Sequence, residues 1–166
     1  MDRLPKTAVV DLDDTVFCTR ERERMAKGPD GQLHWATFMR PEYVASDTPN
    51  LAVIAEVGKL ARAGYTVVYL SGRDDSVRQV TEEALRRHGL PQGKVVLKRN
   101  HQVLEPDLEW KLARLYELAR DHDLVVGVGD RETDWQAYAA LGIAVWKVKD
   151  GQIVERSAVI LEDNNA

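Results

Sequence analysis

Five short apolar runs along the chain predict the strands of a sheet. They are rich in Val, Leu and Tyr and lie at residues 7–12, 65–70, 94–97, 124–128 and 143–146. Runs of this length without polar alternation are typical of strands that are buried on both faces, as in a parallel sheet.

The segments between the later runs have the spacing of amphipathic helices. In the first, Thr48 is the predicted N-cap, Pro49 the first helical residue and Gly64 the stop, with apolar residues three and four positions apart between them. Three more stripes of this kind follow, within residues 76–88, 108–118 and 135–141.

Strands that alternate with helices predict a doubly wound, mostly parallel α/β sheet with helices on both faces. The length of 166 residues favours a single domain over residues 1–166. Residues 16–49 lack a long periodic stretch, so we expect a small flap inserted after the first strand and no large cap domain. The polar end at residues 162–166 is expected to be frayed.

Charge and cysteine content narrow the class of protein. The formal net charge of −4 disfavours a broadly basic nucleic-acid-binding surface and adsorption to an anionic membrane, although local basic patches remain open. Cys18 is the sole cysteine, which excludes an intrachain disulfide and a multi-cysteine zinc site. No secretory signal and no apolar run of 18 residues is seen, so the expected location is the cytoplasm, away from membranes.

Three carboxylates, Asp11, Asp13 and Asp14, follow the first predicted strand. Ligands of doubly wound sheets bind beyond the carboxyl ends of the strands, and the alternating pair Asp11 and Asp13 suits a hard divalent cation together with proton transfer. A solvated turn is the simpler alternative. A calcium loop is disfavoured because Val16 stands where such a loop needs glycine.

Two further motifs follow predicted strands. The segment Ser71-Gly72-Arg73 offers a hydroxyl, a close backbone approach and a guanidinium, which together suit a phosphate. Asp130 and Asp134 share one face of a helix start, where they could serve either as metal ligands or as capping residues.

In this order, the motifs Asp11-x-Asp13-x-Thr15, Ser71-Gly72-Arg73, Lys111 and Gly129-Asp130-x-x-x-Asp134 resemble the haloacid dehalogenase (HAD) superfamily of phosphotransferases, over Thr7 to about Trp146. The resemblance implies that Asp11 is a nucleophile that forms an aspartyl-phosphate and that Asp13 is the general acid/base. It also implies that Ser71 and Lys111 hold the phosphate. The implied cofactor is Mg²⁺, with ligands from Asp11, Asp13 through its carbonyl, and Asp130, and with Asp134 behind them.

A finer resemblance is to the 3′-phosphatase domain of polynucleotide kinase/phosphatase. It rests on Arg40-Pro41-x-Tyr43, Asp47-x-x-Asn50, Asp107-x-x-x-Lys111 and Asp130-Arg131, and it departs at Gly129, where that family commonly has a second acid. It implies a substrate-binding set made up of Thr15, Arg40, Gly72, Arg73, Asp107 and Arg131. The kinase half is absent because the chain has no phosphate-binding Gly-x-x-x-x-Gly-Lys-Ser/Thr loop.

The leading interpretation is therefore a Mg²⁺-dependent phosphatase acting on nucleic-acid 3′ ends or nucleotides. A general acid phosphatase or nucleotidase of the same superfamily is the alternative. A phospho-signalling receiver domain ranks low, because its acceptor Asp would occupy the place of Ser71. The oligomeric state does not follow from the sequence.

The basic and the aromatic residues outside the motifs do not settle whether the chain binds nucleic acid. The basic residues Lys94, Lys98 and Arg99, and those of the flap, either follow a phosphate backbone or form an ordinary solvated surface with i,i+4 pairs. Trp35 and Phe38 are expected to pack under the flap rather than to stack on a base.

Overall fold

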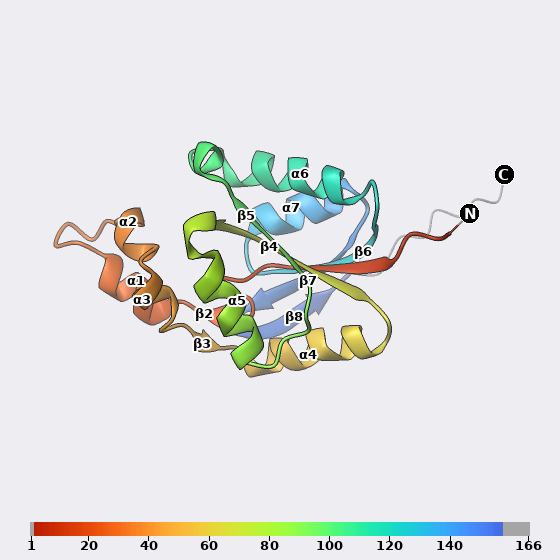
Figure 1. The fold of residues 1–166 in the computed structure, drawn as a ribbon, viewed down its shortest axis with the longest axis horizontal. Helices are drawn as coiled ribbons and strands as arrows, with labels where there is room; N and C mark the ends of the chain where they lie inside the picture. The colour runs from red at the N-terminus through yellow and green to blue at the C-terminus, as the bar shows by residue number, and fades with distance from the viewer. Residues whose placement is uncertain (1, 158–166) are drawn as a thin grey trace.

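The computed structural model describes residues 2–157, so the prediction for residues 162–166 lies outside the described residues. A six-stranded sheet in the order β5-β4-β1-β6-β7-β8 forms its centre (Figure 1). The first five strands are parallel and β8 is antiparallel to β7. The strands are β1 (Lys6–Val10), β4 (Thr66–Asp74), β5 (Lys94–Lys98), β6 (Asp123–Gly129), β7 (Ala144–Lys149) and β8 (Gln152–Arg156).

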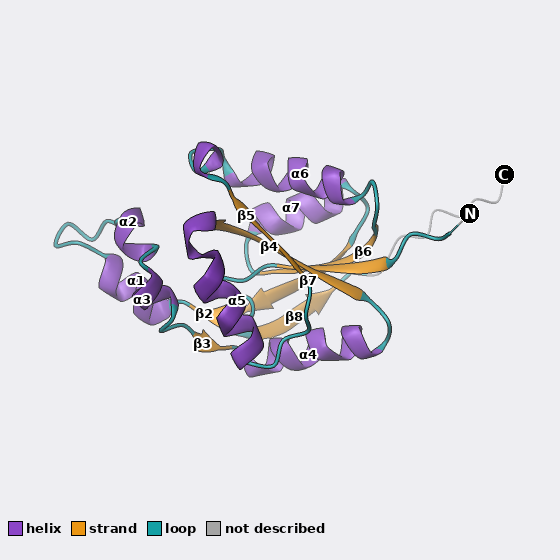
Figure 2. Cartoon of the chain, in the orientation of Figure 1, coloured by secondary structure: helices purple, strands orange, loops and turns teal. Residues whose placement is uncertain are grey.

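Helices cover both faces of this sheet, which confirms the doubly wound prediction (Figure 2). Helices α4 (Leu51–Arg62) and α5 (Arg78–Arg87) cover one face, and α6 (Asp107–Leu118) and α7 (Glu132–Ala140) cover the other. The first pair packs through Val53, Val57 and Leu85, and the second packs through Trp110 and Tyr138. Because β1 lies between β4 and β6, the sheet has its topological switch at the end of β1, where such folds bind ligands.

The flap lies beyond the carboxyl ends of the strands, at the left of Figure 1. Its helices pack on a small apolar cluster of their own, Ala26, Phe38, Met39 and Val44, which also contacts Val77 next to α5. The elements of the flap are β2 (Phe17–Cys18), α1 (Arg20–Ala26), α2 (Trp35–Phe38), α3 (Pro41–Val44) and β3 (Thr48–Pro49).

Two local predictions are corrected, and one strand was missed. Thr48 and Pro49 form β3 rather than the start of a helix, because they pair with Cys18 and Phe17, and α4 begins only after Asn50. Strand β4 continues through residues 71–74 instead of ending at Leu70. The strand β8 was not predicted, since its polar, exposed residues give no buried apolar run.

Candidate active site

A tight turn after β1 brings the first carboxylates together. The carbonyl of Leu12 accepts bonds from three successive amides, those of Thr15, Val16 and Phe17, at 3.0–3.1 Å. Asp14 has the left-handed φ of 58°, a conformation that a short polar side chain tolerates, and its Oδ1 accepts from the amide and hydroxyl of Thr19. The turn holds Asp11 as a buried residue with its carboxylate at the end of the sheet.

Asp11, Asp130 and Asp134 form a carboxylate cluster in which one oxygen of each lies within 4.8 Å of the others. Burial raises the pKa of Asp11 well above its usual range, against the pull of Lys111, and the neighbouring acids raise it further. Burial likewise raises the pKa of Asp130. Crowded hard oxygen donors of this kind fit Mg²⁺, which relieves their mutual repulsion.

Lys111 connects this carboxylate cluster to Asp107. Its Nζ is bonded to Asp134 and lies 3.6 Å from Asp11 Oδ1 and 3.5 Å from Asp107 Oδ2. Burial opposes its charge, but the three carboxylates keep the pKa of Lys111 above its ordinary value. Asp107 is fixed in turn by a 2.9 Å bond from the Thr133 hydroxyl. The lysine is a fixed positive charge beside Asp11.

Two glycines permit this close packing. A Cβ at Gly129 would lie 2.7 Å from Asp134 Oδ2 and 2.8 Å from its Cβ, so no side chain fits there while Asp134 occupies that space. The Asp134 side chain therefore occupies the space that a side chain at residue 129 would need. A Cβ at Gly72 would lie 3.2 Å from Asp107 Oδ1, which explains the glycine after Ser71.

Asp13 belongs to a separate buried network with two arginines and a second acid. Its Oδ1 accepts from Arg22 NH2 at 2.7 Å and from Arg73 Nε at 2.9 Å and NH2 at 2.6 Å. The same two guanidinium groups bind Asp47 at 2.8–3.0 Å. Burial alone would raise the pKa of Asp13, but Arg73 and Arg22 overcome it and lower that pKa to about 2. Asp13 is therefore an ionised group in this conformation.

An open pocket of about 320 Å³ lies above these groups. Its base contains the predicted catalytic residues Asp11, Asp13, Ser71 and Lys111, and its walls contain three predicted substrate contacts, Gly72, Asp107 and Arg131. Lys98, which is buried and donates to the carbonyl of Glu105 at 2.9 Å, completes the polar lining. The apolar lining comes from Trp35 and Phe38 of the flap and from Val103 and Leu104.

Three predicted substrate contacts lie elsewhere. Arg73 is 1% exposed, and its guanidinium binds Asp13, Asp47 and the Thr81 hydroxyl instead of facing the pocket. Thr15 is fully buried, and its hydroxyl donates to Asp11 Oδ2 at 3.0 Å. Arg40 lies on the flap with its guanidinium 5.7 Å from the ring centre of Tyr43.

The sequence analysis did not predict that Arg22 is buried, and it assigned no contact to Asp47. Arg22 is fully buried, with its guanidinium 4.1 Å from the ring centre of Phe38. Its neighbours in the charge run form surface ion pairs, Arg24 with Glu21 three residues away and Lys27 with Glu23 four residues away, which agrees with the solvated-surface alternative. The signal for Arg22 was its position before Ala26 on α1, where the apolar residue marks the buried side of the helix. Phe38 packs under the flap as expected, whereas Trp35 is 42% exposed at the pocket.

Within residues 2–157, no helix has the length and apolar character needed to cross a membrane.

Solved structures share this fold at low sequence identity. A chain of the Pnkp1/Rnl/Hen1 RNA repair complex matches with a TM-score of 0.69 and 20% identity, over 87% of this chain and 42% of that chain. The class C acid phosphatase from Bacillus anthracis matches with 0.59 and 22%, over 80% and 54%. The D,D-heptose 1.7-bisphosphate phosphatase from B. bronchiseptica, complexed with magnesium and phosphate, matches with 0.55 and 18%, over 90% and 92%. The chain thus spans about half or less of the first two proteins.

No curated protein matches this sequence. Residues 2–157 match the sequence profile described as HAD superfamily, subfamily IIIB (Acid phosphatase). This match covers nearly the whole chain and agrees with the carboxylates, Lys111 and the sheet topology described above. The chain therefore belongs to the HAD superfamily of phosphatases, subfamily IIIB.

Proposed function

We propose that this phosphatase depends on Mg²⁺, acts through a phosphorylated Asp11 and removes 3′-phosphates from nucleic-acid ends. The observation that carries the proposal is the open pocket, which holds Asp11, Lys111 and Ser71 at its base and Lys98 and Arg131 at its walls. An anionic ester enters a pocket of this kind with its phosphate toward the base and its remaining charge against the basic walls.

In the first step, a carboxylate oxygen of Asp11 attacks phosphorus and the bond from phosphorus to the ester oxygen breaks. Lys111 and Ser71 stabilise the charge on the phosphoryl oxygens. In the second step, water attacks the phosphorylated Asp11, a proton passes to Asp13, and the carboxylate and inorganic phosphate are released.

The pKa of about 2 keeps Asp13 ionised, so it can accept the proton of the second step, but a carboxylate with so low a pKa is a weak base. To act as an acid in the first step, it must carry a proton, which requires the loss of at least one of its bonds to Arg22 and Arg73. Esters with good leaving groups do not need this proton, so they report on the nucleophile alone.

Asp11, Asp130 and Asp134 are the residues that would hold Mg²⁺, with the carbonyl of Asp13 as a further donor. The ion supplies positive charge that offsets the repulsion between the anionic nucleophile and the phosphate. Thr15 orients Asp11 for this role through its 3.0 Å bond and reaches Asp130 Oδ1 at 3.3 Å.

Three observations favour a nucleic-acid end as the substrate. The pocket is open to a substrate with its own bulk, because the flap provides only short helices at one side. Exposed apolar side chains, Trp35 at 42% and Leu104 at 96%, flank the opening and offer surfaces for a base. One of the similar structures is a chain of an RNA repair complex.

We also propose that residues 1–166 form one cytoplasmic domain with residues 16–49 as its flap.

A general acid phosphatase is the second candidate, and the description of the matching family favours it. The two are separated by a substrate panel of 3′- and 5′-phosphorylated oligonucleotides, 3′-mononucleotides and an aryl phosphate, each with Mg²⁺ and with EDTA. We expect the highest kcat/KM on the 3′-phosphorylated oligonucleotide and no turnover in EDTA. Equal efficiency on all four substrates would support the general phosphatase, and full activity in EDTA would contradict the metal site.

A further inference from the structure

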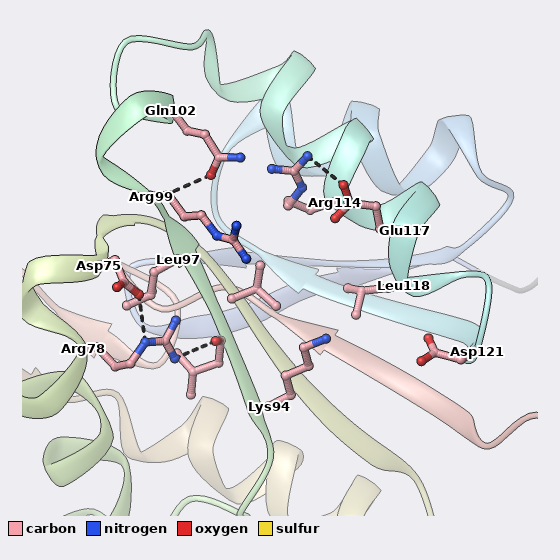
Figure 3. A pocket seen from close by; sticks show the side chains of 12 residues that line it. Asp75, Arg78, Lys94, Leu97, Arg99, Gln102, Arg114, Glu117, Leu118 and Asp121 are labelled. Atoms are coloured by element: carbon pink, nitrogen blue, oxygen red, sulfur yellow. Dashed lines mark hydrogen bonds and ion pairs between the residues drawn. The ribbon is translucent and has the colours of Figure 1, made fainter.

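A second cavity, of about 600 Å³, runs along the free edge of β5 between the start of α5 and the outer side of α6 (Figure 3). The apolar residues Val95, Leu97 and Leu118 line it. Around them stand four basic side chains, Arg78, Lys94, Arg99 and Arg114. We call this cavity the β5 groove.

Two of the three acids of the β5 groove are paired with arginines. Asp75 binds Arg78 at 2.8 Å and Glu117 binds Arg114 at 2.9 Å. The third acid, Asp121, contacts the neighbouring His122 at 2.8 Å, a pair that is ionic only when the imidazole is protonated. By contrast, Lys94 and Arg99 are exposed and form no ion pair within residues 2–157. These two positive charges outnumber the charge of Asp121, so the groove keeps a net positive charge for an anionic ligand.

Further hydrogen-bond donors face the groove. The Oε1 of Gln102 accepts from the amide of Arg99 at 3.0 Å and from Trp110 Nε1 at 3.2 Å. Its amino group is therefore left to face the groove. Arg114 uses Nη2 for Glu117, and its Nε, which has no hydrogen-bond partner, is buried beyond the reach of a ligand. The donors that the groove offers are therefore those of Gln102, Lys94 and Arg99.

The groove adjoins the catalytic pocket. Lys98 lines the pocket and the next residue, Arg99, lines the groove. In the same way, Gln102 lines the groove and Val103 lines the pocket. The short helix η2 (Asn100–Gln102) therefore lies between the two cavities.

The free edge of β5 is poorly suited to an added peptide strand. Arg78 NH1 donates to the carbonyl of Val95 at 2.9 Å and so occupies an acceptor that strand addition would need. A ligand that is recognised through charge rather than through backbone pairing agrees better with this edge.

We propose that the β5 groove binds the backbone of a single-stranded oligonucleotide whose 3′-phosphorylated end lies in the catalytic pocket. This inference rests on the proposed function and adds a path for the nucleotides that precede the end. Lys94 and Arg99 are five residues apart, or about 16 Å along an extended strand. At roughly 3.4 Å for each phosphate of a stacked strand, this distance spans about five nucleotides.

The test compares the wild type with the double variant Lys94→Ala/Arg99→Ala. Fluorescence anisotropy measures binding of an unphosphorylated single strand of about ten nucleotides, a usual site size for such grooves. Each lost phosphate contact lowers the slope of log K against log salt by about 0.7, so the double variant should lose about 1.4 from the slope. Between about 50 and 200 mM salt, the wild type should then lose about sevenfold more affinity than the variant.

The matched control is Lys59→Ala/Arg62→Ala on α4, which removes the same charge from a helix that does not line the groove. It should keep the wild-type slope. A second readout is the ratio of kcat/KM on the ten-nucleotide 3′-phosphorylated strand to that on a 3′-phosphorylated dinucleotide, which should fall several-fold in the groove variant alone.

The outcomes separate the two proposals. If the wild type does not bind the strand, or if both double variants have the same slope, the groove proposal is wrong even when 3′-phosphates are removed. If the salt slope for the single strand depends on Lys94 and Arg99, and neither a peptide nor a duplex displaces the bound single strand, the groove proposal is supported. Absence of 3′-phosphate removal overturns the proposed function whatever the binding result.

Discussion

Replacing Asp47 by Asn removes a negative charge that lies between two buried guanidinium groups. Asp47 accepts from Arg22 through both oxygens, at 3.0 and 2.8 Å, and from Arg73 at 2.9 Å. Arg22 and Arg73 are 0% and 1% exposed. In Asp47→Asn the amino group would face guanidinium N–H donors, so at least one bond is lost and two donors oppose each other.

Breaking one partner of a buried ion pair costs about 3–5 kcal/mol, because the other charge stays buried without compensation. Two features place this variant at the lower end of that range. Asp13 still compensates part of the charge on both arginines. Burial also raises the pKa of Asp47 to about 6 against the pull of both arginines, so above that pH the ionised carboxylate carries a desolvation penalty that Asn avoids. We therefore expect a loss of about 3 kcal/mol, or roughly 6–12 °C in Tm for a domain of this size.

Thermal unfolding followed by circular dichroism at about pH 8, where Asp47 is ionised, measures this loss. The matched control is Glu42→Gln, an exposed acid-to-amide change on α3, which should stay within about 0.5 kcal/mol of the wild type. The Asp47→Asn variant should also hydrolyse alkyl phosphates less well relative to aryl phosphates. Arg22 and Arg73 then bind Asp13 as their one remaining carboxylate, which lowers the pKa of Asp13 further and makes it a poorer proton donor to the leaving group. A Tm within about 2 °C of the wild type would refute the stabilising role of this network.

Three further predictions concern the carboxylates and the turn that supports them. Asp11→Asn should abolish turnover and, in metal-free buffer, raise the Tm, because it relieves repulsion with Asp130 and Asp134; a lower Tm than the wild type would contradict the crowding. Gly129→Ala should lower the unfolding free energy in urea by about 1–3 kcal/mol, since its Cβ would lie 2.7 Å from Asp134 Oδ2, and an unchanged midpoint would show that the helix can move away. Because the pKa of Asp13 is lowered from 3.8 to about 2, its ion pairs stabilise the fold by about 2 kcal/mol at pH values above 3.8, and this contribution is lost as the pH falls through about 2. Acid titrations should therefore show a steeper loss of stability for the wild type than for Asp13→Asn. Parallel curves would argue against the pairing.

The sequence alone was sufficient for the main architecture and for most residues of the candidate pocket. Buried strands need uninterrupted apolar runs, and parallel crossovers allow few arrangements. Asp11 and Asp130, which follow β1 and β6, and Ser71, near the carboxyl end of β4, are therefore expected at one edge of the sheet. The phosphatase family follows from the order of the same motifs and is confirmed by the family match. Lys111 could be assigned from its place in the order of motifs, although its position in the first turns of α6 and within a carboxylate cluster appears only in the structure.

Only the tertiary structure decided which charged side chains are buried and with which partners. Arg22 lies in an alternating charge run that is indistinguishable from a solvated helix, and it becomes buried because the flap packs α1 against Phe38. Arg73 looks like a phosphate ligand beside Ser71, but its guanidinium binds the carboxylates of Asp13 and Asp47, in a part of β4 whose register is irregular between Leu70 and Asp74. Ion pairs between residues 25 to 60 positions apart leave no periodic signal, since each partner is set by how the flap and the sheet pack and not by its neighbours in the chain.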